Sequence, residues 1–417
     1  MVDMRKIAII GAGQAGLQLG FGLLRAGYSV TLCSDKSARE LEQAGPRPVT
    51  IQFGPSVLLE QALDLCLWRV NPLARVDEVY MSVFAPDGQR LMRIEAELSE
   101  PAQSMDLRLK FGRWLRLFAD QGGEVAIGRC GVDELERLAQ SHDLVVVSAG
   151  RGQFTELFAP DPSRCEFDQP QRQVAMFYTR GCDMRVGLDG VEGRQVSRYS
   201  IVAGVGEVIM SPFLSRSGEE HHYVQFEAIP DQGMDMFDRK ADVGEQYDQA
   251  KAWLAQHQAE IHALVERSSL TPEREWVCGR IQPKVREPVG ALPSGAVVMG
   301  IGDAVIVNDP VMAQGLNSAS KWAAHAVQSI QARGDAAFSE AWMRESFEAY
   351  WARAQFSNKL TNTVLCPLGP VQQQLLGFAS QNPRFAKMFV EGIGQAEVFD
   401  PWFWDEDAAK AMMARYA

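Results

Sequence analysis

The sequence lacks the segments that would anchor a protein in a membrane or export it. None of its 417 residues fall in an apolar run long enough to span a bilayer. The one apolar run near the start, Ile7 to Ile10, ends at Gly11 and is too short for the core of a secretory signal peptide. Internal repeats and low-complexity segments are missing as well. We therefore expect a soluble, cytoplasmic protein with no membrane partner.

Disulfides, metal ligands and excess positive charge are also lacking. The seven cysteines are odd in number, form no C-x-x-C pair and have no histidine at metal-ligand spacing, so reduced thiols and no metal are expected. Acidic residues outnumber basic ones by 53 to 41, a net charge of -12 that repels nucleic acid. The remaining composition, 46% apolar with 36 glycines, is that of a globular chain of about two or three domains.

The first thirty-five residues contain the most informative motif. A short apolar run, Lys6 to Ile10, predicts a buried parallel strand, and a helix ending near Gly27 follows it. Between them lies a G-x-G-x-x-G turn. Its first glycine permits the tight turn, the second lets the backbone approach a pyrophosphate, and the third lets the helix pack on the strand. The predicted cofactor-binding residues here are Gly11, Ala12, Gly13, Gln14, Ala15 and Gly16.

After the second strand, residues 28–32, the acidic residue stands one position later than is usual in dinucleotide-binding folds. The acid that binds a ribose in such folds is expected where Ser34 stands, and Asp35 follows one residue late. Either side chain could take that role. The motif does not choose between NAD and FAD, and a glycine-rich turn without a ligand is the alternative explanation.

Later segments of the sequence also contain residues predicted to bind this cofactor. Residues 142–150 and 296–303 each predict a buried strand, and the second ends in Gly302-Asp303. After Asp309-Pro310, a glycine-containing helix start offers backbone N–H groups to an electron-rich ring. An NAD enzyme needs no second set of this kind, whereas the longer FAD molecule does. The predicted cofactor-binding residues here are Gly302, Asp303, Pro310, Gly315, Leu316 and Asn317.

Taken together, these motifs resemble those of the FAD-dependent aromatic hydroxylase superfamily. Within it the chain is most similar to the styrene and indole monooxygenases, the oxygenase half of a two-component system. The resemblance includes Gly45-Pro-Arg47, Asp106-Leu-Arg108-Leu and Asp143 to Gly150. It implies an α/β fold with a Rossmann-type FAD-binding domain, an antiparallel-sheet substrate domain and C-terminal helices. It also implies that Arg47 and Arg108 contact FAD.

The resemblance implies the reaction and its partners. FAD acts as FADH2, delivered by a separate NADH-dependent flavin reductase, and reacts with O2 to give a C4a-hydroperoxide that epoxidises a styrene-like alkene or indole. Ser148-Ala-Gly150 lacks the Asp-Gly pair of single-component hydroxylases, as styrene-type enzymes do. Thr50 stands where those enzymes have an active-site Asn, so the resemblance does not determine the identity of the substrate.

No catalytic side chain is expected, because the flavin activates the oxygen that is transferred to the substrate. The protein has to hold the substrate in a largely apolar pocket that excludes water. None of the six histidines has a companion acid or serine at a meaningful spacing. The predicted lining residues, taken from positions that match the family, are Val49, Thr50, Ile51, Pro310 and, more weakly, Pro212.

We expect a discontinuous domain organisation. Residues 1–50, 100–165 and 275–330 would form the FAD-binding domain, 51–99 and 166–274 the substrate domain, and 331–417 a C-terminal helical region. Within the substrate domain, alternating stretches predict an antiparallel sheet with one covered face, and residues 241–266 predict one amphipathic helix. Aromatic residues near the end of the chain predict contacts in the core or between subunits, so a homodimer is one of the alternatives.

Three alternative functions are compatible with part of these motifs. A single-component NAD(P)H-dependent FAD hydroxylase would consume NADH without a reductase. A flavin-binding redox module would bind the cofactor without oxygenase turnover. An NAD-dependent dehydrogenase is the weakest alternative, because it leaves Gly302-Asp303 and the following helix start unexplained.

Overall fold

A computed structural model describes residues 4–150, 152–184 and 194–417. One of its layers is a six-stranded sheet in the order β15-β16-β7-β1-β2-β6, parallel except for the edge pair β15–β16. The predicted strand of residues 6–10 is confirmed, and four of its five residues are buried, as a strand covered on both faces requires. The strands are β1 (Lys6–Ile10), β2 (Ser29–Ser34), β6 (Glu124–Ile127), β7 (Leu144–Val147), β15 (Val289–Ala291) and β16 (Val297–Gly300).

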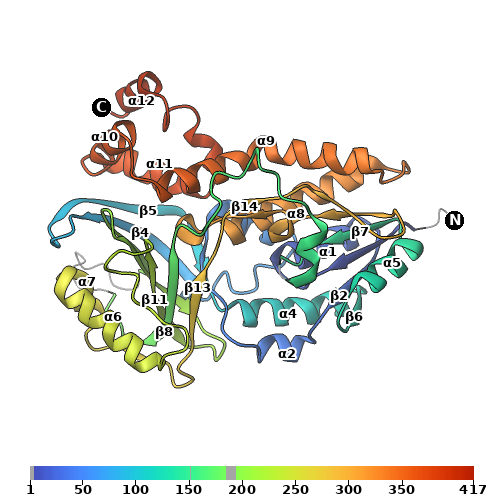
Figure 1. Cartoon of the computed structure of the whole chain (residues 1–417), viewed down its shortest axis with the longest axis horizontal. Helices are drawn as coiled ribbons and strands as arrows, with labels where there is room; N and C mark the ends of the chain where they lie inside the picture. The colour runs from blue at the N-terminus through green and yellow to red at the C-terminus, as the bar shows by residue number, and fades with distance from the viewer. Residues whose placement is uncertain (1–3, 151, 185–193) are drawn as a thin grey trace.

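Helices flank this sheet and share its core. The helices α1 and α8 pack so closely that a Cβ atom on Gly22 would lie 2.5 Å from a methyl carbon of Val327. Figure 1 shows α1, α4 and α5 around the sheet, on the side of the molecule away from β4 and β5. The helices of this part are α1 (Gln14–Arg25), α2 (Ala38–Glu42), α3 (Gly54–Gln61), α4 (Leu107–Asp120), α5 (Val132–Ser141) and α8 (Gln314–Arg333).

A second, nine-stranded sheet has the order β12-β8-β11-β10-β9-β4-β5-β3, with β13 also paired to β8. The strands predicted from the alternating segments after residue 172 are confirmed. The prediction of a single covered face is wrong for β10, in which all nine residues are buried, because both faces of this strand are packed. The strands are β3 (Ile51–Gln52), β4 (Arg75–Phe84), β5 (Arg90–Ser104), β8 (Gln173–Arg180), β9 (Val196–Val202), β10 (Gly206–Leu214), β11 (Glu220–Ala228), β12 (Ser269–Leu270) and β13 (Trp276–Arg280).

The amphipathic segment predicted as one helix is two helices. α6 (Val243–His257) ends and α7 (Ala259–Val265) begins at Gln258, whose φ of -147° and ψ of 67° leave the helical region. The Gln258 side chain is 1% exposed and accepts a hydrogen bond from the Ser200 hydroxyl at 3.1 Å. Hydrophobic periodicity continues across the break, which is why the sequence did not reveal it.

The C-terminal helices cross the top of the view in Figure 1, over both sheets. α11 packs on β5, and the predicted aromatic cluster near the end of the chain is a buried core that includes Phe399, Trp402 and Phe403. Among the described residues no helix is long and apolar enough to cross a membrane. These helices are α9 (Glu340–Leu365), α10 (Pro370–Ala379), α11 (Pro383–Ile393) and α12 (Glu406–Ala414).

Candidate active site

The turn between β1 and α1 gives its three glycines different surroundings. Gly11 has a φ of +116°, and a Cβ atom there would lie 2.8 Å from the Ser148 hydroxyl oxygen. A Cβ atom on Gly16 would lie 2.0 Å from the Gly11 carbonyl oxygen. Around Gly13, by contrast, no described atom lies within 4 Å of the equivalent position. The outer two glycines are therefore required by packing, and the middle one faces open space.

The second glycine motif lies directly against the first. Gly302 follows β16 with a φ of +59°, and a Cβ atom on it would lie 3.1 Å from the Cβ atom of Ala15. Gly150, after β7, is so close to Asp303 that a Cβ atom there would lie 2.2 Å from the Cβ atom of that residue. The ends of β7 and β16 thus meet the start of α1, although these segments are far apart in the sequence.

At the end of β2 the two candidate ribose-binding residues differ in their availability. Ser34 is 3% exposed, and its hydroxyl donates to the carbonyl oxygen of Lys36 at 2.7 Å and accepts from the N–H of the same residue. Asp35 is exposed and forms an ion pair with Lys36. The Ser34 hydroxyl is therefore used within the turn, and the carboxylate of Asp35 stands at the surface.

At the start of α8, Gly315 has open space around it, whereas the side chain of Asn317 is held by hydrogen bonds. Ala313, just before the helix, is in the left-handed region with a φ of 55°, and a Cβ atom on Gly315 would meet no described atom within 4 Å. The Asn317 side chain is fully buried; it accepts from the N–H of Phe53 at 3.0 Å and donates to the Ile51 carbonyl at 2.9 Å. The Asn317 amide thus ties β3 to α8, whereas Gly315 lies at the open end.

A buried polar network that the sequence did not reveal joins the two glycine-rich helices. The Gln14 side chain donates to Glu60 at 2.7 Å and to the Ser320 hydroxyl of α8 at 2.8 Å. Lys110 of α4 forms an ion pair with Glu60 and donates to Gln52 at 2.6 Å. Burial lowers the pKa of Lys110, and the Glu60 carboxylate opposes this effect. The Gln14 side chain therefore points into the protein, so only its backbone is open to a ligand in the turn.

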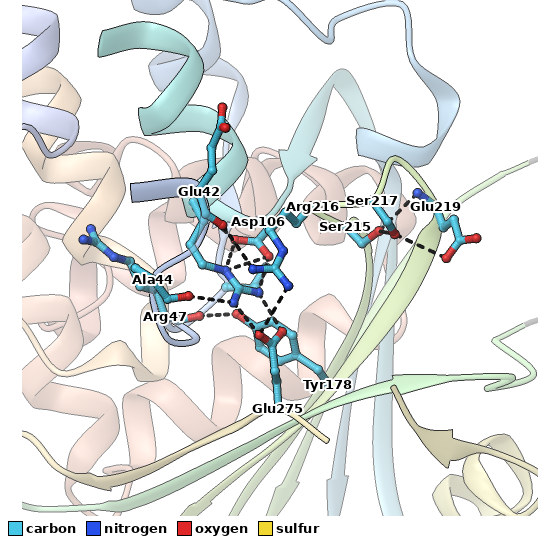
Figure 2. Close-up of polar contacts among 12 residues, drawn as sticks. Glu42, Ala44, Arg47, Asp106, Tyr178, Ser215, Arg216, Ser217, Glu219 and Glu275 are labelled. Carbon is cyan, nitrogen blue, oxygen red and sulfur yellow. Dashed lines mark hydrogen bonds and ion pairs between the residues drawn. The ribbon is translucent and has the colours of Figure 1, made fainter. Parts of the chain in front are cut away.

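Arg108, predicted to contact FAD, is buried between two carboxylates. Its guanidinium donates to Asp106 at 2.6 Å and to Glu275 at 2.7 Å, and it also reaches the Ala44 carbonyl oxygen at 3.1 Å. Burial disfavours the charge, but the hydrogen bonds with Glu275 and Asp106 outweigh it and raise the pKa of Arg108. Figure 2 shows Asp106, Glu275 and Tyr178 converging on the segment that contains Ala44.

The same cluster fixes the loop of Arg47. The Tyr178 hydroxyl on β8 donates to the Arg47 carbonyl oxygen (Figure 2). Arg216, which is paired with Glu275, donates to the Glu42 carbonyl at 3.1 Å. Three backbone carbonyls of residues 42–47 are thus held by side chains of α4, of β8 and of the turn between β10 and β11. No sequence motif connects Glu275 to this loop, because the contact is purely tertiary.

A cavity of about 550 Å³ lies between this loop, the turn at residues 310–313 and the second sheet. Four of the predicted pocket residues line it, namely Val49, Thr50, Ile51 and Pro310, together with Arg47. Most of the other lining side chains are apolar. They include Phe53, Val79, Met81, Val174, Ile209, Trp276, Val277, Val311, Met312 and Ile393. The cavity has the size and character of a small-molecule site.

The structure departs from the prediction at one lining residue and adds several others. Pro212 is buried in β10, opposite His222, and is not among the described residues that line this cavity. Tyr199, Tyr223 and Gln225 line it instead, and Ser197 and Arg280 are further polar lining residues on the sheet. Residues 223 and 225 share one face by strand alternation, but the sequence could not show which face meets the loop.

Comparison with known proteins identifies the class of enzyme. A family model described as "Styrene monooxygenase A putative substrate binding domain" matches residues 150–263. The styrene monooxygenase StyA of Pseudomonas fluorescens is 25% identical over 418 residues, covering 94% of each chain. A second StyA, from Pseudomonas sp, is 25% identical over 415 residues with the same coverage. The chain is a styrene monooxygenase-like, FAD-dependent monooxygenase.

The fold is shared with flavoproteins of other activities. The solved structure of the flavin-dependent brominase Bmp2 superposes with a TM-score of 0.68 at 16% identity, covering 98% of each chain. At this identity the likeness shows the architecture alone. It confirms the predicted α/β fold class, and the styrene monooxygenase-like assignment makes a flavin the cofactor of this enzyme.

Proposed function

We propose that this enzyme is the oxygenase component of a two-component system and epoxidises styrene-like aromatic alkenes or indole. It would use FADH2 supplied by a separate NADH-dependent flavin reductase. The observation that carries the proposal is the position of the largely apolar cavity, whose wall at residues 310–313 leads directly into the open start of α8.

The described residues fit a flavin at this place. In the first turns of both α1 and α8, the described residues include no acid and no side-chain cap, so helical N–H groups are available to an anion or an electron-rich ring. Gly13 and Gly315 leave open space at these two helix starts. We assign the pyrophosphate to the 11–16 turn and the ring to the Gly315 end.

The other predicted contacts follow from this assignment. Asp303, held beside Gly150, would bind the hydroxyl-rich chain between phosphate and ring, and Asp35 would bind the ribose. Arg47 lines the cavity and would contact the cofactor from its loop. Arg108 is committed to Asp106 and Glu275, so we assign it the role of positioning that loop.

The chemistry is divided between cofactor and protein. The reduced flavin supplies the activation of oxygen when it is bound. The chain holds the alkene near the ring and excludes water through side chains such as Val49, Ile51 and Met312. Thr50 adds a hydroxyl at the position where related enzymes have an amide, which makes it a candidate determinant of substrate choice.

The test is to mix the purified protein with chemically reduced FAD, O2 and either styrene or indole. Catalase is included, because free hydrogen peroxide could oxidise the substrate without the enzyme. Styrene oxide, or an indigo-type pigment from indole, is the expected result. Rapid NADH consumption with oxidised FAD and no reductase would instead indicate a single-component hydroxylase. If no product forms from several alkenes, a flavin-binding redox module is favoured.

A further inference from the structure

Four ionisable side chains are buried together behind the wall of the cavity. They are Arg172, Glu207, Glu227 and Asp309, and their exposed fractions are 3%, 4%, 0% and 0%. Three carboxyl groups and a single cation are therefore buried in this cluster. Burial strongly disfavours two uncompensated negative charges in one cluster, so we expect it to contain at least one proton.

The cation is already used by one of the three acids. Arg172 donates to both carboxylate oxygens of Glu207, at 2.7 and 2.9 Å. Its remaining hydrogen bonds go to the carbonyl oxygens of Gln171 at 3.0 Å and Leu365 at 3.3 Å. This bidentate geometry makes Arg172–Glu207 an ion pair. Glu227 and Asp309 form no ion pair among the described residues, although the charge of Arg172 lowers the pKa of both and so opposes the effect of burial.

Each of the two remaining acids has one satisfied and one unsatisfied oxygen. Glu227 accepts from the Gln225 side-chain amide through Oε1, and Asp309 accepts from the Val311 N–H at 3.1 Å through Oδ1. Neither Oε2 of Glu227 nor Oδ2 of Asp309 has a hydrogen-bond partner among the described residues, and both atoms are buried. A buried carboxylate oxygen in this situation is stable only if it carries or accepts a proton.

The electrostatics of the cluster point in the same direction. Burial, and after it the charge of Asp309, raises the pKa of Glu227 well above its ordinary value. Burial also raises the pKa of Asp309, to about 7. The other titratable groups facing this pair are Arg172, Glu207, Tyr199 and Tyr223.

We infer that Glu227 and Asp309 keep one proton between them in the folded protein and act as positioning residues for two walls of the cavity. Glu227 fixes Gln225 on the sheet wall, and Asp309 fixes the turn at residues 310–313, which forms the opposite wall. The proton comes from solvent, and the only bond formed is the O–H bond of the protonated carboxyl. When the proton leaves at higher pH, a second uncompensated negative charge is buried, and the residues that it fixes in the two walls are destabilised.

Infrared spectroscopy of the cofactor-free protein tests this inference independently of the proposed reaction. At about pH 6, below the raised pKa of Asp309, we expect the carbonyl stretching band of a protonated carboxyl group. Glu227→Gln or Asp309→Asn should shift or weaken this band, and the double variant should abolish it. Glu220→Gln, on the same strand as Glu227, is the control and should leave it unchanged. Absence of the band in the wild type, or its persistence in the double variant, would overturn the inference.

A second readout covers the case in which one variant folds poorly. The unfolded chain ionises these acids at ordinary pH, whereas the folded protein keeps a proton, so their contribution to stability declines as the pH rises from about 4 to about 7. Glu227→Gln and Asp309→Asn imitate the protonated state and should be more stable than the wild type at pH 8, with the difference shrinking towards pH 4. A difference that stays constant across this range would contradict a shared proton.

Discussion

Gly302 and Ala15 lie against each other, although they belong to two motifs at opposite ends of the cofactor-binding part of the chain. A Cβ atom on Gly302 would stand only 3.1 Å from that of Ala15. This contact places the Gly-Asp segment after β16 beside the start of α1. It gives the proposal that both segments hold one FAD molecule a physical basis, because a single ligand can reach both.

Gly302→Ala should weaken FAD binding beyond its effect on folding. The substitution adds a side chain in a left-handed conformation, at a cost of about 1–2 kcal/mol, and pushes it against Ala15. Gly295→Ala is the matched control, since Gly295 also has a positive φ but no described atom within 4 Å of its Cβ position. We expect both variants to lose stability in denaturant melts, Gly302→Ala somewhat more because of the contact with Ala15, and only Gly302→Ala to lose FAD affinity in titrations. Equal affinities would argue against this placement of the cofactor.

Arg108→Gln should be strongly destabilising, because it leaves the buried Asp106 without its cation and Glu275 with only the longer contact to Arg216. The expected loss in free energy of unfolding is about 3–5 kcal/mol. Arg216→Gln, at a residue whose side chain is 33% exposed, should cost about 1 kcal/mol or less. Arg108→Lys keeps the positive charge but loses the bidentate hydrogen bonds of the guanidinium. It should therefore fold better than Arg108→Gln yet bind FAD more weakly than the wild type. Unchanged FAD affinity in Arg108→Lys would show that the loop of Arg47 does not depend on this residue.

Thr50→Phe should change substrate selection rather than abolish the reaction. The larger side chain takes up room in the cavity, so kcat/KM should fall more for a diaryl alkene than for styrene, by about tenfold or more in their ratio. Epoxide formation from both alkenes, measured with chemically reduced FAD, gives this ratio. Equal losses for the two substrates would mean that Thr50 does not face the bound alkene.

His222 should make the folded state sensitive to acid. Burial lowers the pKa of His222 to about 4, so the folded protein keeps the ring neutral while the unfolded chain takes up a proton near pH 6.5. Its contribution to stability is therefore present above pH 6.5 and is lost as the pH falls towards 4, by roughly 2–3 kcal/mol. His222→Gln should flatten this part of the profile in denaturant melts, and His262→Gln, in α7, should not. A profile unchanged by His222→Gln would contradict this assignment.

The glycine motifs were the most predictable part of the site. The tasks assigned to Gly11 and Gly16 from their spacing match the surroundings that these residues have, because the geometry of a strand–turn–helix unit is local. Gly13 has the open space that its predicted task requires, and its contact with a pyrophosphate stays a prediction. Arg108 and Asn317 show where this reasoning stops. The sequence places both in cofactor motifs, but it cannot show that their side chains bond to Glu275 and to the backbone at Ile51, which are distant in the chain.

The cavity was predictable in part. Thr50 and Pro310 were identified because they stand at positions that match related enzymes. Tyr199 and the acids behind the wall were not, since nothing in the pattern of a strand shows which of its faces covers a ligand or which carboxyl groups meet in the core. The break at Gln258 was missed for a similar reason, because hydrophobic periodicity continues through it.

The central claim is that the starts of α1 and α8 hold the two ends of one FAD molecule. FAD titration of Gly13→Ala and Gly315→Ala tests it most directly, because a methyl group at either position meets no described atom within 4 Å and should leave the stability near that of the wild type. Gly233→Ala, at an equally open and exposed position in the loop after β11, is the control. We predict that each of the two variants weakens FAD binding by about tenfold or more, equivalent to about 1.4 kcal/mol, and that Gly233→Ala does not. Wild-type affinity in either Gly13→Ala or Gly315→Ala, with folding intact, would contradict the claim.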